Sequence, residues 1–318
     1  MFEEGVKGRF AISIPKEDVL PVIAALGDVM RTAGQYDACD AGHGWQDSGL
    51  WGGGSTATAC KKWVAVPGAD GKAVAPSVTE QGVFMIGTNA GPHELAGSQC
   101  NRMFFTTSWQ NDQTPEAMGE YLQKQGVNDV YLMAPNYAAG KDMLTGFKRY
   151  FKGRIVDEVY TKLGQQDYQA EISQLRAKKP RAVFVFYPGA MGINFIRQYD
   201  QAGLHGKIPL YSAFTVDQTT LPALGDAARG LWSAGYWSSE LDNPANREYV
   251  SQFRKKYGYT PSFYGAEAYD GIMLIDAAVR AVKGNLADKE GLIKAFDAAG
   301  RFRMIWGLSA AAGRFGPH

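Results

Sequence analysis

Short apolar runs alternate with amphipathic stretches between residue 82 and about residue 236. This alternation of strand-like and helix-like segments is typical of a parallel α/β sheet. The expected strands are GVFMI (82–86), RMFFTTSW (102–109), DVYLMAP (129–135), RIVDEVYT (154–161), AVFVFYP (182–188), PLYSAF (209–214) and GLWSAGYW (230–237). The helices expected between them cover 114–126, 140–153, 167–180 and 189–203.

Three further helices are expected after the last of these strands. Asn243 is placed as an N-cap before Pro244, and apolar positions at helical spacing follow; two more helical patterns cover 262–284 and 288–300. These helices need a second sheet to cover. We therefore predict two doubly wound parallel-sheet lobes joined by a hinge, with lobe one formed by 1–113 plus 243–318 and lobe two by 114–242.

Residues 31–72 show neither the two-residue period of a strand nor the 3.6-residue period of a helix in their hydrophobic positions. The segment is rich in glycine, contains two cysteines and three tryptophans, and predicts no element that we can assign. A long structureless stretch inside a compact lobe argues that part of the lobe is missing.

The composition excludes several classes of protein. With 318 residues, 45% hydrophobic and 20% charged, the chain can bury a large core. Its 33 basic and 32 acidic residues leave a net charge of +1, so we expect no nucleic-acid partner. No apolar run approaches the roughly 20 residues that span a bilayer. The first residues, MFEEGVKGRF, lack the basic start and apolar centre of a signal peptide.

Sequence motifs for catalysis and for metal binding are lacking. PNYAAGKD has proline where a phosphate-binding loop begins with glycine, YPGAMG lacks the leading G-x-G of a dinucleotide loop, and no G-x-S-x-G is present. The four histidines are scattered, and Cys39, Cys60 and Cys100 allow at most one disulfide. We expect no enzyme, no cofactor and no metal; a pair of carboxylates acting without a motif stays open as the enzymatic alternative.

Small and polar residues recur where the expected strands end, at 88–91, 136–138, 188–190 and 215–217. Ligands of open α/β sheets bind at this edge, and the helix N-termini that follow favour anions, so a small carboxylate is the expected ligand. Tyr137 and Tyr187 end two strands and offer a ring and a hydroxyl, although both also suit packing at the rim. Asp217 suits a ligand ammonium, or simply begins the turn VDQTT. Ordinary connecting turns remain the alternative for all four loops.

An ordered set of segments resembles the type I periplasmic binding proteins of ABC importers, within the branch that takes branched-chain amino acids, amides and aromatic carboxylates. The segments are VTEQGVFMIGTNAGPHELAGSQCN, FFTTSWQNDQTPEAMGEY, YLMAPNYAAGKDMLTGFKRYFKG, AVFVFYPGAMGINFIRQYDQAGL, IPLYSAFTVDQTTLP and YGYTPSFYGAEAYDG, and the resemblance covers about 74–298. It implies two lobes that close on a ligand at their hinge, and a periplasmic, monomeric protein that hands a small carboxylate to membrane permease subunits.

The resemblance also implies roles for individual residues. The 88–91 segment resembles the one whose amides and hydroxyl hold a ligand carboxylate, Tyr137 matches a tyrosine that covers the ligand, Tyr187 or a neighbour matches the next contact, and Asp217 lies near the acid that takes an α-ammonium. The implied ligand-binding residues are Thr88, Asn89, Ala90, Gly91, Trp109, Tyr137, Tyr187, Asp217 and Tyr264. Trp109 and Tyr264 are the expected side walls.

Both ends of the chain depart from this pattern, since residues 1–73 and 299–318 lack the clear strands and ligand loop of the family. Residues 1–73 offer at best RFAISI and EDVLPVIAAL as candidate elements. We therefore expect an incomplete lobe one, an unpaired edge at GVFMI, and weak or absent ligand binding. The expected function is the substrate-binding component of an importer for a branched-chain or other hydrophobic amino acid. The alternatives are an aromatic-acid-binding protein of the same type, a ligand-sensing domain of a receptor or regulator, and an enzyme.

Overall fold

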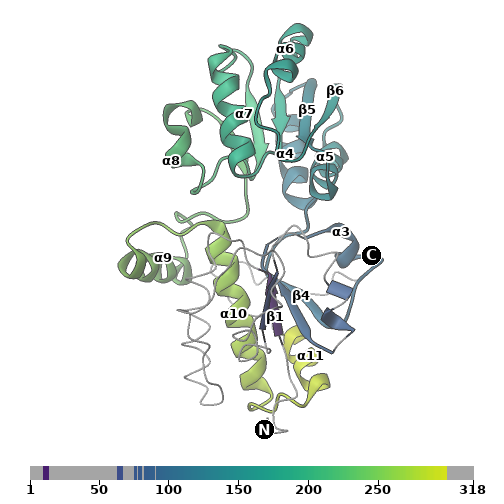
Figure 1. The fold of residues 1–318 in the computed structure, drawn as a ribbon, viewed down its shortest axis with the longest axis vertical. Helices are drawn as coiled ribbons and strands as arrows, with labels where there is room; N and C mark the ends of the chain where they lie inside the picture. The colour runs from purple at the N-terminus through teal and green to yellow at the C-terminus, as the bar shows by residue number, and fades with distance from the viewer. Residues whose placement is uncertain are drawn as a thin grey trace, which may run out of the picture. The chain divides into compact units, whose positions relative to one another are not determined.

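The chain divides into two compact units, one formed by Met1–Trp109 with Ser239–His318 and the other by Gln110–Ser238 (Figure 1). The computed structural model describes residues 10–13, 63–66, 75–76, 78–80, 82–89 and 91–298, the first two of these ranges by their backbone alone. The chain leaves the first unit after Trp109 and returns to it at Ser239, a few residues before each of the positions expected from the sequence.

The first unit is built on sheet A, in which the described strands follow the order β2-β1-β3-β4 and every pair is parallel. The strands are β1 (Phe10–Ser13), β2 (Trp63–Val66), β3 (Phe84–Gly87) and β4 (Phe104–Thr106). Because β3 pairs with β1 on one side and β4 on the other, the expected unpaired edge at GVFMI was wrong.

The same pairing shows that the sheet of lobe one contains the strands that we expected to be missing. RFAISI supplies β1, and β2 lies within the segment for which the sequence predicted no element. The candidate RFAISI is therefore confirmed as a strand, whereas β2 has four residues, too few for a period-2 pattern to stand out in a glycine-rich background. The remainder of 31–72, which includes Cys39 and Cys60, lies outside the described residues, and so do residues 299–318.

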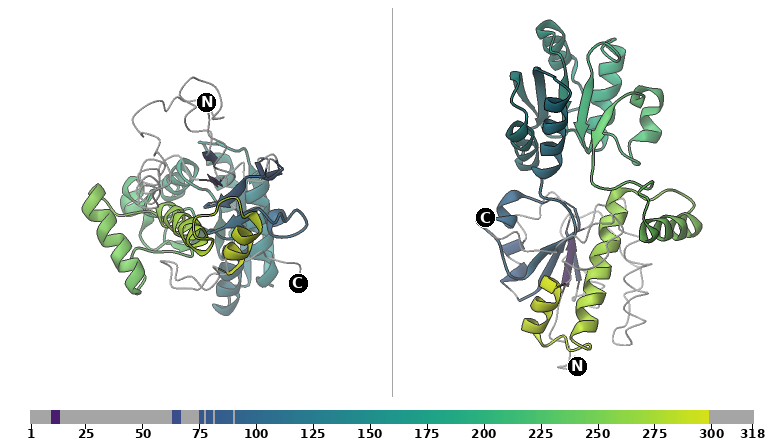
Figure 2. Two further views of the ribbon diagram at one scale, coloured as in Figure 1. Left: turned by 90° about the horizontal axis from the view of Figure 1, so that it is seen from below. Right: turned by 180° about the vertical axis from the view of Figure 1, so that it is seen from behind.

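Helices from the C-terminal part of the chain lie beside sheet A (Figure 2). Phe84 of β3 and Phe105 of β4 meet Phe296, with ring centroids 5.4 and 4.6 Å apart, and the same core includes residues of α10 (Phe263–Ala281). The helices of this unit whose bounds the structure describes are α3 (His93–Ala96), α9 (Pro244–Tyr257), α10 (Phe263–Ala281) and α11 (Lys289–Ala298). The expected cap at Asn243 is confirmed, because its side chain accepts a hydrogen bond of 2.8 Å from the Asn246 amide.

The second unit is built on sheet B, with the parallel strand order β6-β5-β7-β8-β9. The strands are β5 (Asp129–Pro135), β6 (Arg154–Thr161), β7 (Val183–Val185), β8 (Leu210–Ala213) and β9 (Trp232–Ala234), all within the runs expected from the sequence. The runs that form β5 and β7 are almost entirely apolar, because strands in the middle of a parallel sheet are buried on both faces.

Helices cover both faces of sheet B, as a doubly wound fold requires. On one face, Phe147 stacks on Phe184 with ring centroids 4.4 Å apart; on the other, Tyr131 and Val185 pack in a cluster with Phe195. The helices are α4 (Gln113–Lys124), α5 (Ala138–Tyr150), α6 (Gln169–Lys178), α7 (Ala190–Gln201), α8 (Leu221–Leu224) and the 3-10 helix η3 (Gly225–Ala228). Within the described part of the chain, none of the helices combines the length and the apolar character that crossing a membrane demands.

Candidate functional site

The carboxyl end of sheet A carries the segment 88–91, which follows β3 directly. Two hydroxyls that follow along β4 hold its backbone: the Thr106 hydroxyl donates to the Gly87 carbonyl at 2.9 Å and the Ser108 hydroxyl to the Asn89 carbonyl at 2.7 Å. Thr88 is fully buried, and Ala90 lies outside the described residues. The sequence drew attention to the segment but not to the hydroxyls that fix it.

Helix α10 closes over the same segment. A Cβ added to Gly271 would lie 2.7 Å from Cγ2 of Thr88, so only glycine allows the helix to approach this closely. Between Thr106 and Ser108, the Thr107 hydroxyl turns the other way and donates to the Glu267 carbonyl of α10 at 2.9 Å. The 88–91 segment is therefore held between β4 and α10.

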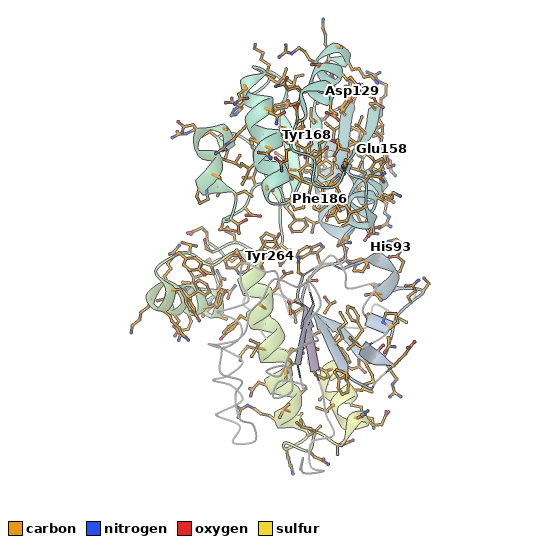
Figure 3. The ribbon with its side chains drawn as sticks, in the orientation of Figure 1. His93, Asp129, Glu158, Tyr168, Phe186 and Tyr264 are labelled. Carbon is orange, nitrogen blue, oxygen red and sulfur yellow. The ribbon has the colours of Figure 1, made fainter. Side chains whose placement is uncertain are left out.

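The two expected side walls, Trp109 and Tyr264, both belong to one aromatic cluster in the first unit. Their rings are joined through Phe263, whose centroid lies 5.9 Å from that of Trp109 and 3.9 Å from that of Tyr264. Tyr264 lies at the N-terminal end of α10 (Figure 3) and is half-buried. Phe263, which the sequence did not single out, is the buried centre of this cluster.

The carboxyl end of sheet B carries a second aromatic pair. Tyr137 follows β5 and stacks on Phe186, which follows β7 and is labelled in Figure 3, with ring centroids 6.3 Å apart and an angle of 18° between the planes. Phe186 is buried, whereas Tyr137 keeps part of its surface exposed. Burial, with the nearby Asp142 carboxylate, raises the pKa of the Tyr137 phenol, so the ring presents a neutral hydroxyl at physiological pH.

Tyr187 lies in the core of the second unit and not beside Tyr137. Its side chain is fully buried, its hydroxyl accepts a hydrogen bond of 3.1 Å from the Thr161 hydroxyl, and its ring lies 5.0 Å from Tyr168 and 5.1 Å from Phe195. Because neighbouring side chains along an extended chain point to opposite faces, Tyr187 turns toward α6 and α7 while Phe186 reaches Tyr137. This position matches the alternative interpretation of Tyr187, in which the side chain serves packing.

Asp217 caps the turn that precedes α8. Its Oδ1 accepts hydrogen bonds from the Thr219 amide and hydroxyl, both at 2.6 Å, and from the Thr220 amide at 3.1 Å. This is the local turn role that the sequence left open as an alternative, and it fixes the orientation of the carboxylate.

The two edges therefore offer different chemistry. Sheet A ends in an anchored backbone segment beside hydroxyls, which suits a carboxylate, and sheet B ends in a stacked aromatic pair, which suits an apolar body. Phe186, Thr106 and Ser108 are the residues that sequence reasoning missed. Their signals were the polar step TTS within the expected strand RMFFTTSW and the alternation within VFVFY.

Known proteins of one family match this chain. A sequence model of the family described as "Periplasmic binding protein" matches residues 60–316, which extends the region of resemblance at both ends. The chain is 28% identical over 225 residues to the Leu/Ile/Val-binding protein homolog 6 of Brucella melitensis, covering 68% of this chain and 57% of that relative. The chain thus spans little more than half the length of this curated relative.

Solved structures share the fold along nearly the whole chain. An ABC transporter substrate-binding protein from Sphaerobacter thermophilus is similar with a TM-score of 0.79 and 25% identity, over 98% of this chain and 91% of that one. A solute-binding protein from R. palustris, solved in complex with benzoate, gives a TM-score of 0.74 and 24% identity, over 94% and 87%. The fold is the type I periplasmic binding protein fold, and with the family match this shows that the chain belongs to the periplasmic binding proteins.

Proposed function

We propose that this chain is the substrate-binding component of an ABC importer and captures a small carboxylate with an apolar body. The observation that carries the proposal is the Tyr137–Phe186 stack at the carboxyl end of β5 and β7, where open α/β sheets bind their ligands. The 88–91 segment supplies amide donors to the carboxylate, with Trp109 and Tyr264 as neighbouring walls. The protein acts in the periplasm, as a monomer, on permease subunits in the membrane, and catalyses no reaction.

Two ligand classes are proposed. A branched-chain or other hydrophobic amino acid is supported by the relative named as a Leu/Ile/Val-binding homolog. An aromatic acid is supported by the flat stacked pair, since ring faces favour stacking on other rings, and by the R. palustris structure that contains benzoate. All three printed hydrogen bonds at Asp217 go to Oδ1, so the geometry of this carboxylate does not distinguish the two classes.

Isothermal titration of the chain, freed of carried-over ligand by unfolding and refolding, tests the proposal with L-leucine, L-isoleucine, benzoate and 4-hydroxybenzoate. We expect saturable 1:1 binding of at least one of them. Tyr137→Ala should lower that affinity by a factor of about 5 to 150, which corresponds to the roughly 1–3 kcal/mol of an aromatic anchor.

Tyr150→Ala is the matched control, because Tyr150 ends the same helix α5 and is 50% exposed. Its affinity should equal that of the parent chain. Equal affinity for Tyr137→Ala would remove Tyr137 from the site, and absence of binding by any of the four carboxylates would contradict the proposed function. Chemical turnover of a bound ligand would favour the enzymatic alternative instead.

A further inference from the structure

We propose that one stripe of α5 clamps the start of the second unit, so that movement between the units bends the first crossing at a single point, the junction of Trp109 and Gln110. The chain passes from one unit to the other at this junction. The stripe consists of Asp142, Gly146 and Arg149, whose spacing of four and three residues places them on one face of the helix. We call these three residues the α5 clamp.

Residues 110–113 form a tight turn directly after the junction. The Gln113 amide donates to the Gln110 carbonyl at 3.0 Å, which closes the turn where α4 begins. Two side chains reinforce it: Nε2 of Gln110 donates to Oδ1 of Asp112 at 2.7 Å, and the Gln110 amide donates to Oε1 of Gln113 at 3.2 Å. The turn is therefore held together from its first residue.

The α5 clamp holds this turn at three places along the helix. Nδ2 of Asn111 donates to Oδ2 of Asp142 at 3.1 Å, and both residues are buried. Arg149 pairs with Oδ2 of Asp112 at 2.6 Å, and this aspartate is almost fully buried. Between these contacts, a Cβ added to Gly146 would lie 2.1 Å from the Asp112 carbonyl oxygen, so only glycine lets the helix approach the turn this closely. The turn therefore moves with α5.

The residues just before the junction are fixed within the first unit. The Ser108 hydroxyl donates to the Asn89 carbonyl at 2.7 Å. Trp109 is 8% exposed, and its ring meets that of Phe263 edge-on with centroids 5.9 Å apart. Because the chain is held on both sides up to neighbouring residues, rotation about the backbone bonds that join Trp109 to Gln110 disturbs the fewest contacts, as hinge bending requires.

The helix that carries the clamp also carries the proposed ligand contact. Tyr137 is the N-cap residue of α5, so the ring and the clamp belong to one helix of 13 residues. Bending at one junction restricts the paths along which this ring can move when the units move. The clamp therefore limits the arrangements of the ligand-free protein, and closure on a ligand loses less conformational entropy.

Distance measurements without ligand test the clamp directly. One spin label is placed on Cys100, which is exposed in the first unit, and a second on Gln201→Cys at the exposed end of α7; Cys39 and Cys60 are replaced by serine. The width of the distance distribution then reports how freely the units move. We expect Arg149→Met to broaden the distribution, because Asp112 loses its partner and the turn can leave α5. An unchanged width would overturn the proposal.

Two variants serve as matched controls. Lys148 is the neighbour of Arg149 on α5 and pairs with Glu158 of β6 at 2.6 Å, so Lys148→Met loses an ion pair of the same kind away from the crossing. Glu116→Gln removes the second partner of Arg149, also at 2.6 Å, and leaves the contact with the turn in place. Both should keep the width of the parent chain. Equal broadening in Lys148→Met would show a general loosening of α5 and overturn the clamp.

A second clamp variant acts without removing a charge. Gly146→Ala should broaden the distribution as Arg149→Met does, although alanine favours a helix more than glycine. Hydrogen exchange locates the loosened part: in both variants the Gln113 amide should exchange faster, while the amides of β5 and β7 exchange as in the parent chain. Unchanged exchange at Gln113, or an equal acceleration in both strands, would overturn the clamp.

Ligand affinity is the functional readout, and only this measurement rests on the proposed function. Titrated with benzoate and with L-leucine, Arg149→Met should bind more weakly than the parent chain by a factor of about 5 to 30, which corresponds to ordering one additional residue. Lys148→Met should keep the affinity of the parent chain. Equal affinity in Arg149→Met would contradict the effect on closure. A parent chain that binds neither acid would contradict the proposed function, and the distance measurements would then decide the clamp by themselves.

Discussion

Replacing Tyr187 with phenylalanine should destabilise the second unit without changing ligand affinity. The ring keeps its contacts with Tyr168 and Phe195, but the Thr161 hydroxyl loses the acceptor that it meets at 3.1 Å. Thr161 is 3% exposed, so its donor finds no water in exchange, and leaving such a group unsatisfied costs about 1–3 kcal/mol. Exchange of the slowest amides of β5 and β7 should therefore speed up by a factor of about 5 to 150.

The double variant Thr161→Val with Tyr187→Phe is the internal control. It replaces both partners by apolar groups of similar shape. Its free energy of unfolding should therefore lie closer to that of the parent chain than the free energy of unfolding of either single variant does. Costs that simply add would show that the hydroxyl pair contributes nothing jointly. A loss of ligand affinity in Tyr187→Phe comparable with that in Tyr137→Ala would return Tyr187 to the binding site and refute the packing role.

Three further outcomes are expected. Gly271→Ala should weaken ligand binding, because the new Cβ would lie 2.7 Å from Cγ2 of Thr88; unchanged affinity in calorimetry would mean that α10 can shift at no cost to the segment. Burial and then the Asp157 carboxylate raise the pKa of Tyr131 from 10.0 to about 12, so the contribution of Tyr131 to stability is intact below pH 10 and is lost between pH 10 and 12. Denaturant titrations across this pH range should therefore show a smaller loss of stability in Tyr131→Phe than in the parent chain. An equal loss in the two proteins would contradict this assignment. Asn243→Ala should destabilise the start of α9 by about 1 kcal/mol, seen as faster exchange in its first turn, and an unaltered first turn would show that the cap is dispensable.

The sequence predicted the second unit almost completely, and the reason is physical. Its central strands are buried on both faces, and runs such as DVYLMAP carry so much apolar character that β5 has the expected bounds. The cap at Asn243 was equally readable, because a capping side chain acts within one turn of its own position. Features fixed by local chemistry could be predicted.

The first unit was harder to predict, because its strands are held by pairing with residues that are distant in the sequence. β1 could be named from the sequence only as the candidate RFAISI, and β2 was not predicted, because each strand has four residues and is held by pairing with residues far away in the sequence. The candidate site shows the same division. Strand ends could be placed from sequence, but whether Phe186 or Tyr187 meets Tyr137 depends on the face to which each points, and one residue of register decides it.

The insertion of one unit within the other has a consequence for synthesis on the ribosome. All residues of the second unit, Gln110–Ser238, emerge as one uninterrupted stretch, so this unit can fold while translation continues. The first unit cannot complete its folding at that stage, because Phe84 and Phe105 pack against Phe296, which leaves the exit tunnel much later. Early folding of the insertion also draws the ends of that long loop nearer to each other and lowers the entropy lost when the loop closes. A nascent chain halted before α10 would expose β3 and β4 to chaperones while sheet B was already complete.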